Sequence, residues 1–151
     1  MKAWKAADTS FTFVDSHNKT YSVRDGSDWE QTLKPRLHER LNASANVVLF
    51  LSSETKYSRA LREEIDYAIN TNGLPIIVVY PEIKDKVGVH TSVGFTTKVK
   101  NLWNTLPVFR DNKYKVPVLH VPNDKKLIRN ALGDTDFRVA TKTKATDYFY
   151  K

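Results

Sequence analysis

The chain has 151 residues, 40% of them hydrophobic, which is enough for a single domain over residues 1–151 with a substantial core. It has no cysteine, which excludes disulfides and thiol catalysis, and no run of 18 apolar residues or apolar signal segment, so we expect a cytoplasmic protein with no membrane partner. The net charge is +7, but the lysines form no polybasic block, which favours a solvated surface over a nucleic-acid site.

The first segment of the chain predicts a short arm followed by a strand. Residues 1–9 have Trp4 as their strong apolar anchor, and residues 11–15 alternate in part as a strand does. Asp15 and His17 leave the carboxyl end of this predicted strand, where they could contact a ribose or a phosphate. Because Asp and Ser are also ordinary loop formers, a structural loop is the alternative.

A helix is predicted next. Ser27 and Glu30 have the spacing of a capping box, and a buried stripe follows at intervals of four, made of Trp29, Leu33, Leu37 and Leu41. Pro35 lies inside this stretch, where a regular helix would lose about 3 kcal/mol, so we expect a kink or a local rearrangement. His38 falls on the polar side and is predicted to be a surface residue, in preference to a ligand or base.

Residues 46–81 predict a parallel strand–helix–strand unit. Residues 47–51 and 76–80 are short apolar runs typical of strands covered on both faces. Ser58 can cap the intervening helix, which ends near Gly73. Ligands of open α/β sheets bind beyond the carboxyl ends of the strands. The turn at residues 52–55, with Ser52 and Thr55, and the helix start at Ser58 are therefore the first candidates for substrate binding.

The helix carries two adjacent glutamates in unequal positions. At roughly 100° per residue, Leu61 and Ile65 lie on the core face, Glu63 points nearly opposite, and Glu64 falls at the flank of the apolar stripe. Glu64 is therefore the predicted half-buried carboxylate, a position that favours a role in a pocket. A boundary glutamate paired with a nearby basic side chain is the alternative.

The second part of the chain is the basic part. Residues 84–151 hold 14 Lys and Arg against 6 Asp and Glu, whereas residues 1–83 hold 10 against 11. We expect one short helix at residues 99–103, a strand at 116–121, a helix capped by Asp124, and a strand or aromatic clamp at 147–151. His120 alternates with apolar residues and is predicted to be a structural histidine in preference to a metal ligand.

No rival catalytic motif is present. The five glycines have neither Rossmann nor Walker spacing, no His/Cys/Asp cluster suggests a metal, and no GxSxG elbow suggests a hydrolase. We therefore expect no metal and no resident cofactor.

Several segments together resemble one family. Residues 55–68, which run Thr-Lys-Tyr-Ser-Arg-Ala-Leu-Arg-Glu-Glu-Ile-Asp-Tyr-Ala after an apolar strand, resemble the third-strand and third-helix segment of TIR-like domains. The resemblance is closest to the bacterial TIR-like group of Thoeris-type anti-phage defence. Residues 2–6, 11–17 and 24–27 resemble further segments of that group in the same order, so the resemblance covers roughly residues 1–83.

The resemblance implies a fold and an activity. The fold is α/β and flavodoxin-like, with three layers and a central, mainly parallel sheet. In such TIR domains the helix glutamate cleaves the nicotinamide–ribose bond of NAD, and by position that residue is Glu64. NAD is then a substrate, and the products are ADP-ribose or a cyclic signal read by a downstream effector. The family also implies self-association, so a non-catalytic association module is the second hypothesis and a nucleic-acid-binding domain a weaker third.

Two departures from the family pattern bear on these expectations. Ala60 stands where the family has a tryptophan in the helix motif, and by the resemblance we expect the family's first strand to be missing before the segment that Met1 begins. An absent central strand would leave unpaired backbone groups in the sheet. We therefore expect the C-terminal tail, or the same segment of a partner chain, to pack near that gap.

Overall fold

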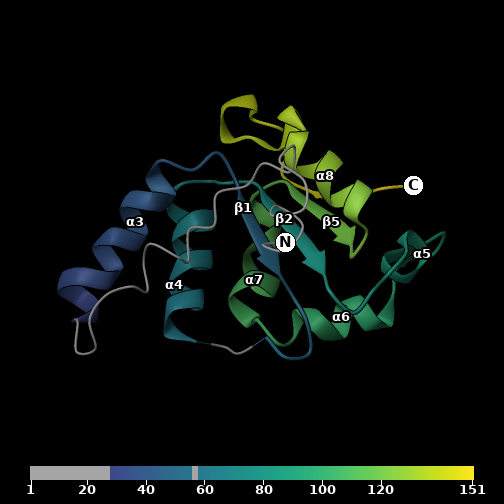
Figure 1. Ribbon diagram of the computed structural model, residues 1–151, viewed down its shortest axis with the longest axis horizontal. Helices are drawn as coiled ribbons and strands as arrows, with labels where there is room; N and C mark the ends of the chain where they lie inside the picture. The colour runs from purple at the N-terminus through teal and green to yellow at the C-terminus, as the bar shows by residue number, and fades with distance from the viewer. Residues whose placement is uncertain (1–27, 56–57) are drawn as a thin grey trace.

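Four parallel strands form the centre of the part of the chain that the structure describes (Figure 1). This computed structural model describes residues 28–55 and 58–151, so the predicted strand at 11–15 with Asp15 and His17 lies outside the described residues. The strands stand in the order β1-β2-β5-β6, and every neighbouring pair is parallel. Their bounds are β1 (Val47–Phe50), β2 (Ile76–Tyr80), β5 (Val118–Pro122) and β6 (Asp147–Phe149).

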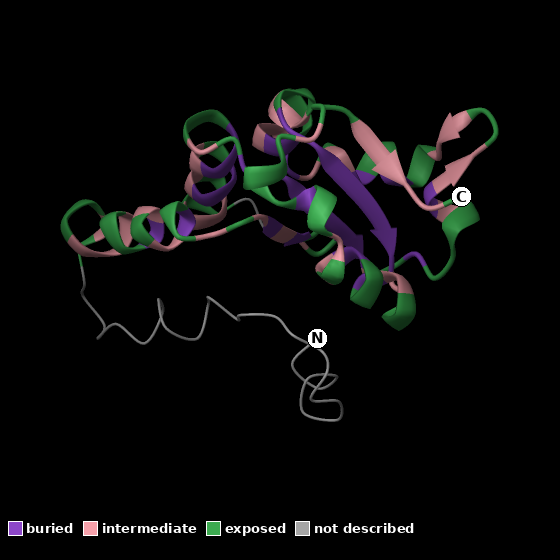
Figure 2. Ribbon diagram, turned by 90° about the horizontal axis from the view of Figure 1, so that it is seen from above, coloured by how far each residue is buried: buried purple, intermediate pink, exposed green. Residues whose placement is uncertain are grey.

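Helices cover both faces of this sheet, as Figures 1 and 2 show. The described residues form six α-helices: α3 (Lys34–Asn42), α4 (Arg59–Asp66), α5 (Lys86–Val89), α6 (Thr97–Trp103), α7 (Pro107–Asn112) and α8 (Lys125–Gly133). One core cluster joins the sheet to α3, α4, α6 and α7, and a second joins its other face to α8. This confirms the predicted three-layer α/β architecture of flavodoxin type with a mainly parallel sheet.

The central strands are hydrophobic except for His120 on β5, because both of their faces are buried. Every residue of β2 and of β5 is buried. Along β2, Ile76 and Val78 belong to the first core cluster, whereas Ile77 and Val79 belong to the second. This alternation follows the two-residue period of a strand. The predicted strands at 47–51 and 76–80 are therefore confirmed.

A wide turn precedes α3, where the sequence has Pro35. The segment η1 (Trp29–Leu33) is π-helical, and Pro35 is the second residue of α3, which follows η1 directly. The predicted rearrangement is confirmed. The expected cap was Ser27, which lies outside the described residues. The observed cap is Asp28, whose carboxylate accepts a hydrogen bond from the Gln31 N–H at 3.0 Å.

The helical stretch that starts with α4 begins and ends at the predicted residues, although α4 itself ends at Asp66. The Ser58 hydroxyl oxygen accepts from the Leu61 N–H at 3.1 Å, so Ser58 is the N-cap. After α4 the chain continues as the π-helical segment η2 (Tyr67–Thr71) and stops at Gly73, whose φ of +61° suits a glycine after a helix.

The long connection between β2 and β5 contains more structure than we expected. The predicted helix at 99–103 is confirmed as α6, but α5, α7, the turn η3 (Lys113–Lys115) and an antiparallel pair were not predicted. That pair consists of β3 (His90–Thr91) and β4 (Gly94–Phe95). Each of these pieces is only two to six residues long, which is too short to show a periodic pattern.

The C-terminal segment forms the strand β6, which confirms one of the two structures that we expected there, a strand or an aromatic clamp. It does not lie beside β1, however, because β6 pairs with β5 at the opposite edge of the described sheet. In this chain the expected position of the tail is therefore wrong. The reason is a pair of contacts between residues far apart in the sequence, since Asp147 bonds to His120 and to Lys113, which hold β6 in place beside β5.

Candidate functional site

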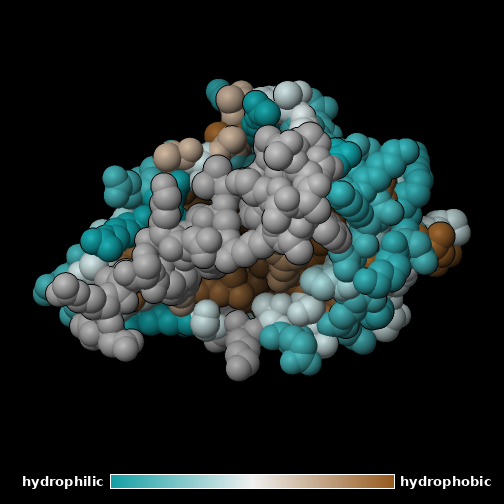
Figure 3. All heavy atoms as spheres, in the orientation of Figure 1, coloured by the Kyte–Doolittle hydropathy of each residue, from teal (hydrophilic) through white to brown (hydrophobic). Residues whose placement is uncertain are grey.

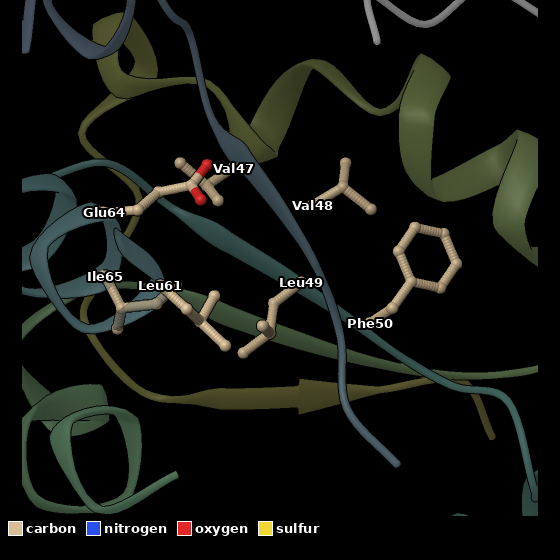
Figure 4. Close-up of a pocket in the computed structure, with 7 residues that line it drawn as sticks. All are labelled: Val47, Val48, Leu49, Phe50, Leu61, Glu64 and Ile65. Carbon is tan, nitrogen blue, oxygen red and sulfur yellow. The ribbon is translucent and has the colours of Figure 1, made fainter. Parts of the chain in front are cut away.

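A groove runs along β1 and is bounded on one side by α4. It holds about 140 Å³ and is lined by seven residues, which are Val47, Val48, Leu49, Phe50, Leu61, Glu64 and Ile65 (Figure 4). We call it the β1–α4 groove. In Figure 3, apolar side chains gather in the middle of the molecular face that carries β1. Glu64 is the one charged side chain among these seven lining residues.

Glu64 reaches this groove because of its place on α4. Leu61 and Ile65, one turn and one residue away, also line the groove, so this edge of the helix faces β1. Glu64 is only 9% exposed, and among the described residues the buried polar side chains are Glu64 and His120. Figure 4 shows the Glu64 carboxylate beside Val47, at the start of β1. The predicted boundary position of Glu64 is thus confirmed, with deeper burial than expected.

The groove follows the edge of β1 and touches side chains on both faces of the strand. Val47 and Leu49 extend to the side of α4, whereas Val48 and Phe50 extend to the other side (Figure 4). Phe50 is 41% exposed. A ligand group in contact with Glu64 would therefore lie against Val47, Leu49 and the helix, and Phe50 belongs to the opposite face of the sheet.

Glu63 has different surroundings from its neighbour. Its Oε1 atom lies 2.7 Å from His38 Nε2 and 3.7 Å from Lys34 Nζ, both on α3. The His38 ring stacks on Tyr67 at 3.6 Å, so His38 is packed between two helices and is not the surface residue that we predicted. The polar residues of α3 suggested a face exposed to solvent, but polar side chains of α3 contact a polar side chain of α4.

Ser52 and Thr55 come together at the carboxyl end of β1. The Thr55 hydroxyl oxygen accepts from the Ser52 N–H at 2.9 Å, and the two hydroxyl oxygens are 3.4 Å apart. Ser58 follows as the cap of α4. None of these three residues lines the β1–α4 groove, whose charged group lies at the other end of the strand. Their role in substrate binding stays a prediction, as does that of Asp15 and His17, which lie outside the described residues.

The sequence reasoning did not single out Glu82, which closes the same turn. Its Oε1 atom accepts from both the N–H and the hydroxyl of Ser53, each at 2.5 Å. These hydrogen bonds lower the pKa of Glu82 below its ordinary value, with a further contribution from the charge of Lys98. Its place directly after β2, at the carboxyl edge of the sheet, is the signal that could have identified it.

No group of three or more acidic or histidine side chains within residues 28–55 and 58–151 could hold a metal ion. No helix in that part of the chain is long and apolar enough to cross a bilayer.

The family comparison agrees with this architecture. The model of the Thoeris protein ThsB, TIR-like domain, matches residues 1–86, which is more than half of the chain. The matched range contains β1, α4 and β2, and with them Glu64 and the groove that it lines. The chain therefore belongs to the TIR-like domain family of the Thoeris protein ThsB, a component of anti-phage defence.

Proposed function

We propose that this protein is an NAD-consuming enzyme that breaks the nicotinamide–ribose bond, with Glu64 as its catalytic carboxylate. NAD is a substrate in this proposal and not a resident cofactor. The products are nicotinamide and either ADP-ribose or a cyclic ADP-ribose-type signal for a downstream effector. Membership of the Thoeris TIR-like family supports a nucleotide signal in anti-phage defence.

The observation that carries the proposal is the position of Glu64 in the β1–α4 groove. The carboxylate is nearly buried and its groove neighbours are hydrocarbon side chains. In such surroundings a carboxylate interacts with a developing positive charge more strongly than it would in water. The other buried polar residue of the described chain, His120, does not line this groove.

The chemistry needs a negative charge close to one ribose carbon. When the bond between C1′ and the nicotinamide nitrogen breaks, its electron pair leaves with nicotinamide, and C1′ acquires oxocarbenium character. Glu64 stabilises that positive centre. Water then adds to C1′ and loses a proton, which gives ADP-ribose; attack by an adenine nitrogen in place of water gives a cyclic product.

The volume of the β1–α4 groove determines how much of the proposed substrate the described residues can hold. Pockets for ligands of cofactor size span roughly 300–1,000 Å³. The β1–α4 groove, at about 140 Å³, has room for a sugar-sized group. The described residues thus account for the ribose end of the substrate in this proposal, and the groups that bind the remainder of the dinucleotide are not assigned.

The test is incubation of the purified protein with NAD, followed by chromatography and mass spectrometry of nicotinamide and of the adenosine-containing product. Glu64→Gln removes the charge at nearly constant volume, so we expect release to fall by at least about 100-fold while the fold persists. The matched control is Glu63→Gln on the same helix, which should retain turnover. Full activity of the Glu64→Gln protein would refute the proposal.

A non-catalytic module that acts by self-association is the second candidate. The observation in its favour is that Ser52, Thr55 and Ser58 serve the turn and the helix cap, and that Glu64 is the single charged group among the described residues that line the groove. Absence of nicotinamide release from both the native protein and the Glu64→Gln variant, in the monomer and in assemblies, would favour this candidate.

A further inference from the structure

A buried polar network joins the C-terminal strand to the interior of the molecule, away from the β1–α4 groove. His120 is fully buried on β5, and its Nε2 atom lies 2.9 Å from Asp147 Oδ1 on β6. Its Nδ1 atom lies 2.7 Å from the hydroxyl oxygen of Tyr80 on β2. We call Tyr80, Trp103, Lys113, His120 and Asp147 the His120 network.

The donors and acceptors of this network agree with one protonation state of His120. The indole N–H of Trp103 can only donate, and it donates to the Tyr80 oxygen at 2.8 Å. Asp147 also accepts from Lys113, so this carboxylate is an acceptor, and His120 must donate to it from Nε2. His120 Nδ1 is then the acceptor for the Tyr80 O–H. Neutral His120 therefore satisfies every polar atom in the chain of hydrogen bonds.

A second proton on His120 disrupts this arrangement. Nδ1 would become a donor facing the Tyr80 oxygen, and the Tyr80 hydroxyl hydrogen would lose its acceptor in a buried site. Lys113 and His90 also lie near enough for their positive charges to oppose protonation, whereas Asp147 favours it. Burial is the largest effect, and with these charges it lowers the pKa of His120 below its ordinary value of 6.5.

The strand β6 is the part of the sheet that can open most readily to admit that proton. It has three residues, none of them fully buried, and it lies at an edge. Asp147 joins β6 to the network through its contact with His120. Phe149 of the same strand stacks on the His90 ring, with the ring centroids 3.5 Å apart. Loss of β6 removes one wall of the His120 site without opening the pairing of β1 with β2.

We propose that His120 is a proton-operated latch, which holds the C-terminal strand β6 in the sheet while it is neutral and releases that strand when it is protonated. The released form exposes the outer edge of β5 and frees residues 142–151. The sign follows from linkage, because the docked form binds protons less well than the released form. Above pH 6.5 the equilibrium therefore favours the docked form to its full extent. As the pH falls below 6.5, the ratio of docked to released form decreases by up to about tenfold per pH unit.

The proposal can be tested on the native protein by NMR hydrogen exchange between pH 7 and pH 4.5, corrected for the intrinsic pH dependence of exchange. The Val118 N–H donates to the Thr146 carbonyl across the β5–β6 boundary, whereas the Leu51 N–H donates to Val79 between β1 and β2. We expect protection at Val118 to fall below pH 6.5 and to depend little on added urea, because local release exposes little surface. Leu51 should keep the higher protection that global unfolding requires.

Three variants test whether His120 is the histidine whose protonation releases β6. His120→Gln should abolish the pH dependence at Val118, whereas His38→Gln, on α3, should leave it intact. His90→Phe keeps a ring against Phe149 without a titratable group, so the pH dependence at Val118 should persist, altered only by the loss of the His90 charge that opposes protonation of His120. If the His120→Gln variant does not fold, the ring-proton titration of His120 in the native protein decides the matter. The proposal would be overturned if the Val118 N–H were as strongly protected as the Leu51 N–H. It would also be overturned if protection at Val118 stayed unchanged while His120 gained its proton.

Discussion

At the scale of single residues, two adjacent glutamates on α4 show how a rotation of roughly 100° about the helix axis gives two side chains different surroundings. Glu63 bonds to His38 on α3 and helps to join two helices, whereas Glu64 is turned toward β1 and lies in an apolar groove. The two side chains have the same chemistry, so any difference in activity between their variants reports on position alone. This makes the pair an internal comparison for the proposed NAD cleavage.

Ser58 allows a cap to be separated from a substrate contact. Its oxygen accepts from the Leu61 N–H, so Ser58→Ala should lower the free energy of unfolding by about 1 kcal/mol, measured by urea denaturation. Ser58→Asp restores a cap acceptor and should recover that stability. Recovered stability together with lost NAD turnover in Ser58→Asp would support the predicted substrate contact, and unchanged stability in Ser58→Ala would contradict the cap.

The candidate site was predictable where helical periodicity decides the position and not where loop contacts decide it. Glu64 followed from its rotation relative to Leu61 and Ile65, and the structure places it beside both in the groove. Glu82 did not follow, because its pairing with Ser53 joins residues 29 positions apart. Periodicity carries no information about such a contact between two loops.

At the scale of elements, α4 owes its stability to the face that it packs against the sheet. Ile65 is completely buried in the first core cluster, whereas Arg62, on the same helix, is exposed. We expect Ile65→Ala to destabilise the protein by about 2–5 kcal/mol and Arg62→Ala by less than about 0.5 kcal/mol, both measured by urea denaturation. Similar effects of the two substitutions would contradict this account of α4.

The elements that the sequence predicted correctly are those with long or strongly apolar patterns. The strands β1 and β2, the capped helices α4 and α8, and α6 each have such a pattern or a cap. Apart from α6, the segment from α5 to η3 consists of pieces held by particular contacts, such as the Thr96 hydroxyl that donates to the Gly88 carbonyl at 2.7 Å. Those contacts form only in the folded chain, so local sequence could not predict these pieces.

At the scale of the whole molecule, the order of the strands determines which residues can act together. The β1–α4 groove lies at one edge of the described sheet and β6 lies at the other, with β2 and β5 between them. The sequence predicted parallel strands but could not place the tail, because its place depends on the pairing of Asp147 with His120 and Lys113 across the fold. The proposed latch and the proposed catalytic group are therefore separate regions, and their variants should be independent.

Acid stability of the whole molecule should depend on Asp147. Burial raises the pKa of this carboxyl group, but while β6 is docked the hydrogen bonds from His120 and Lys113 and the positive charge of Lys113 outweigh burial and hold the pKa below its ordinary value of 3.8. The folded state therefore binds this proton less well than the unfolded state. The stabilisation is present above pH 3.8 and is lost as the pH falls through the lower pKa of the folded state.

Urea denaturation at a series of pH values from 7 to 2 measures this contribution. Asp147→Asn should lower the free energy of unfolding at pH 7 by about 2 kcal/mol, because it removes a charged acceptor from a partly buried network, and should flatten the decline below pH 4. Asp111→Asn is the control: Arg110 lowers the pKa of Asp111 through a hydrogen bond, but the pair is exposed, and solvent screening should leave stability unchanged. Equal acid sensitivity in the native protein and in Asp147→Asn would show that other carboxyl groups, and not the one that holds β6, determine acid unfolding.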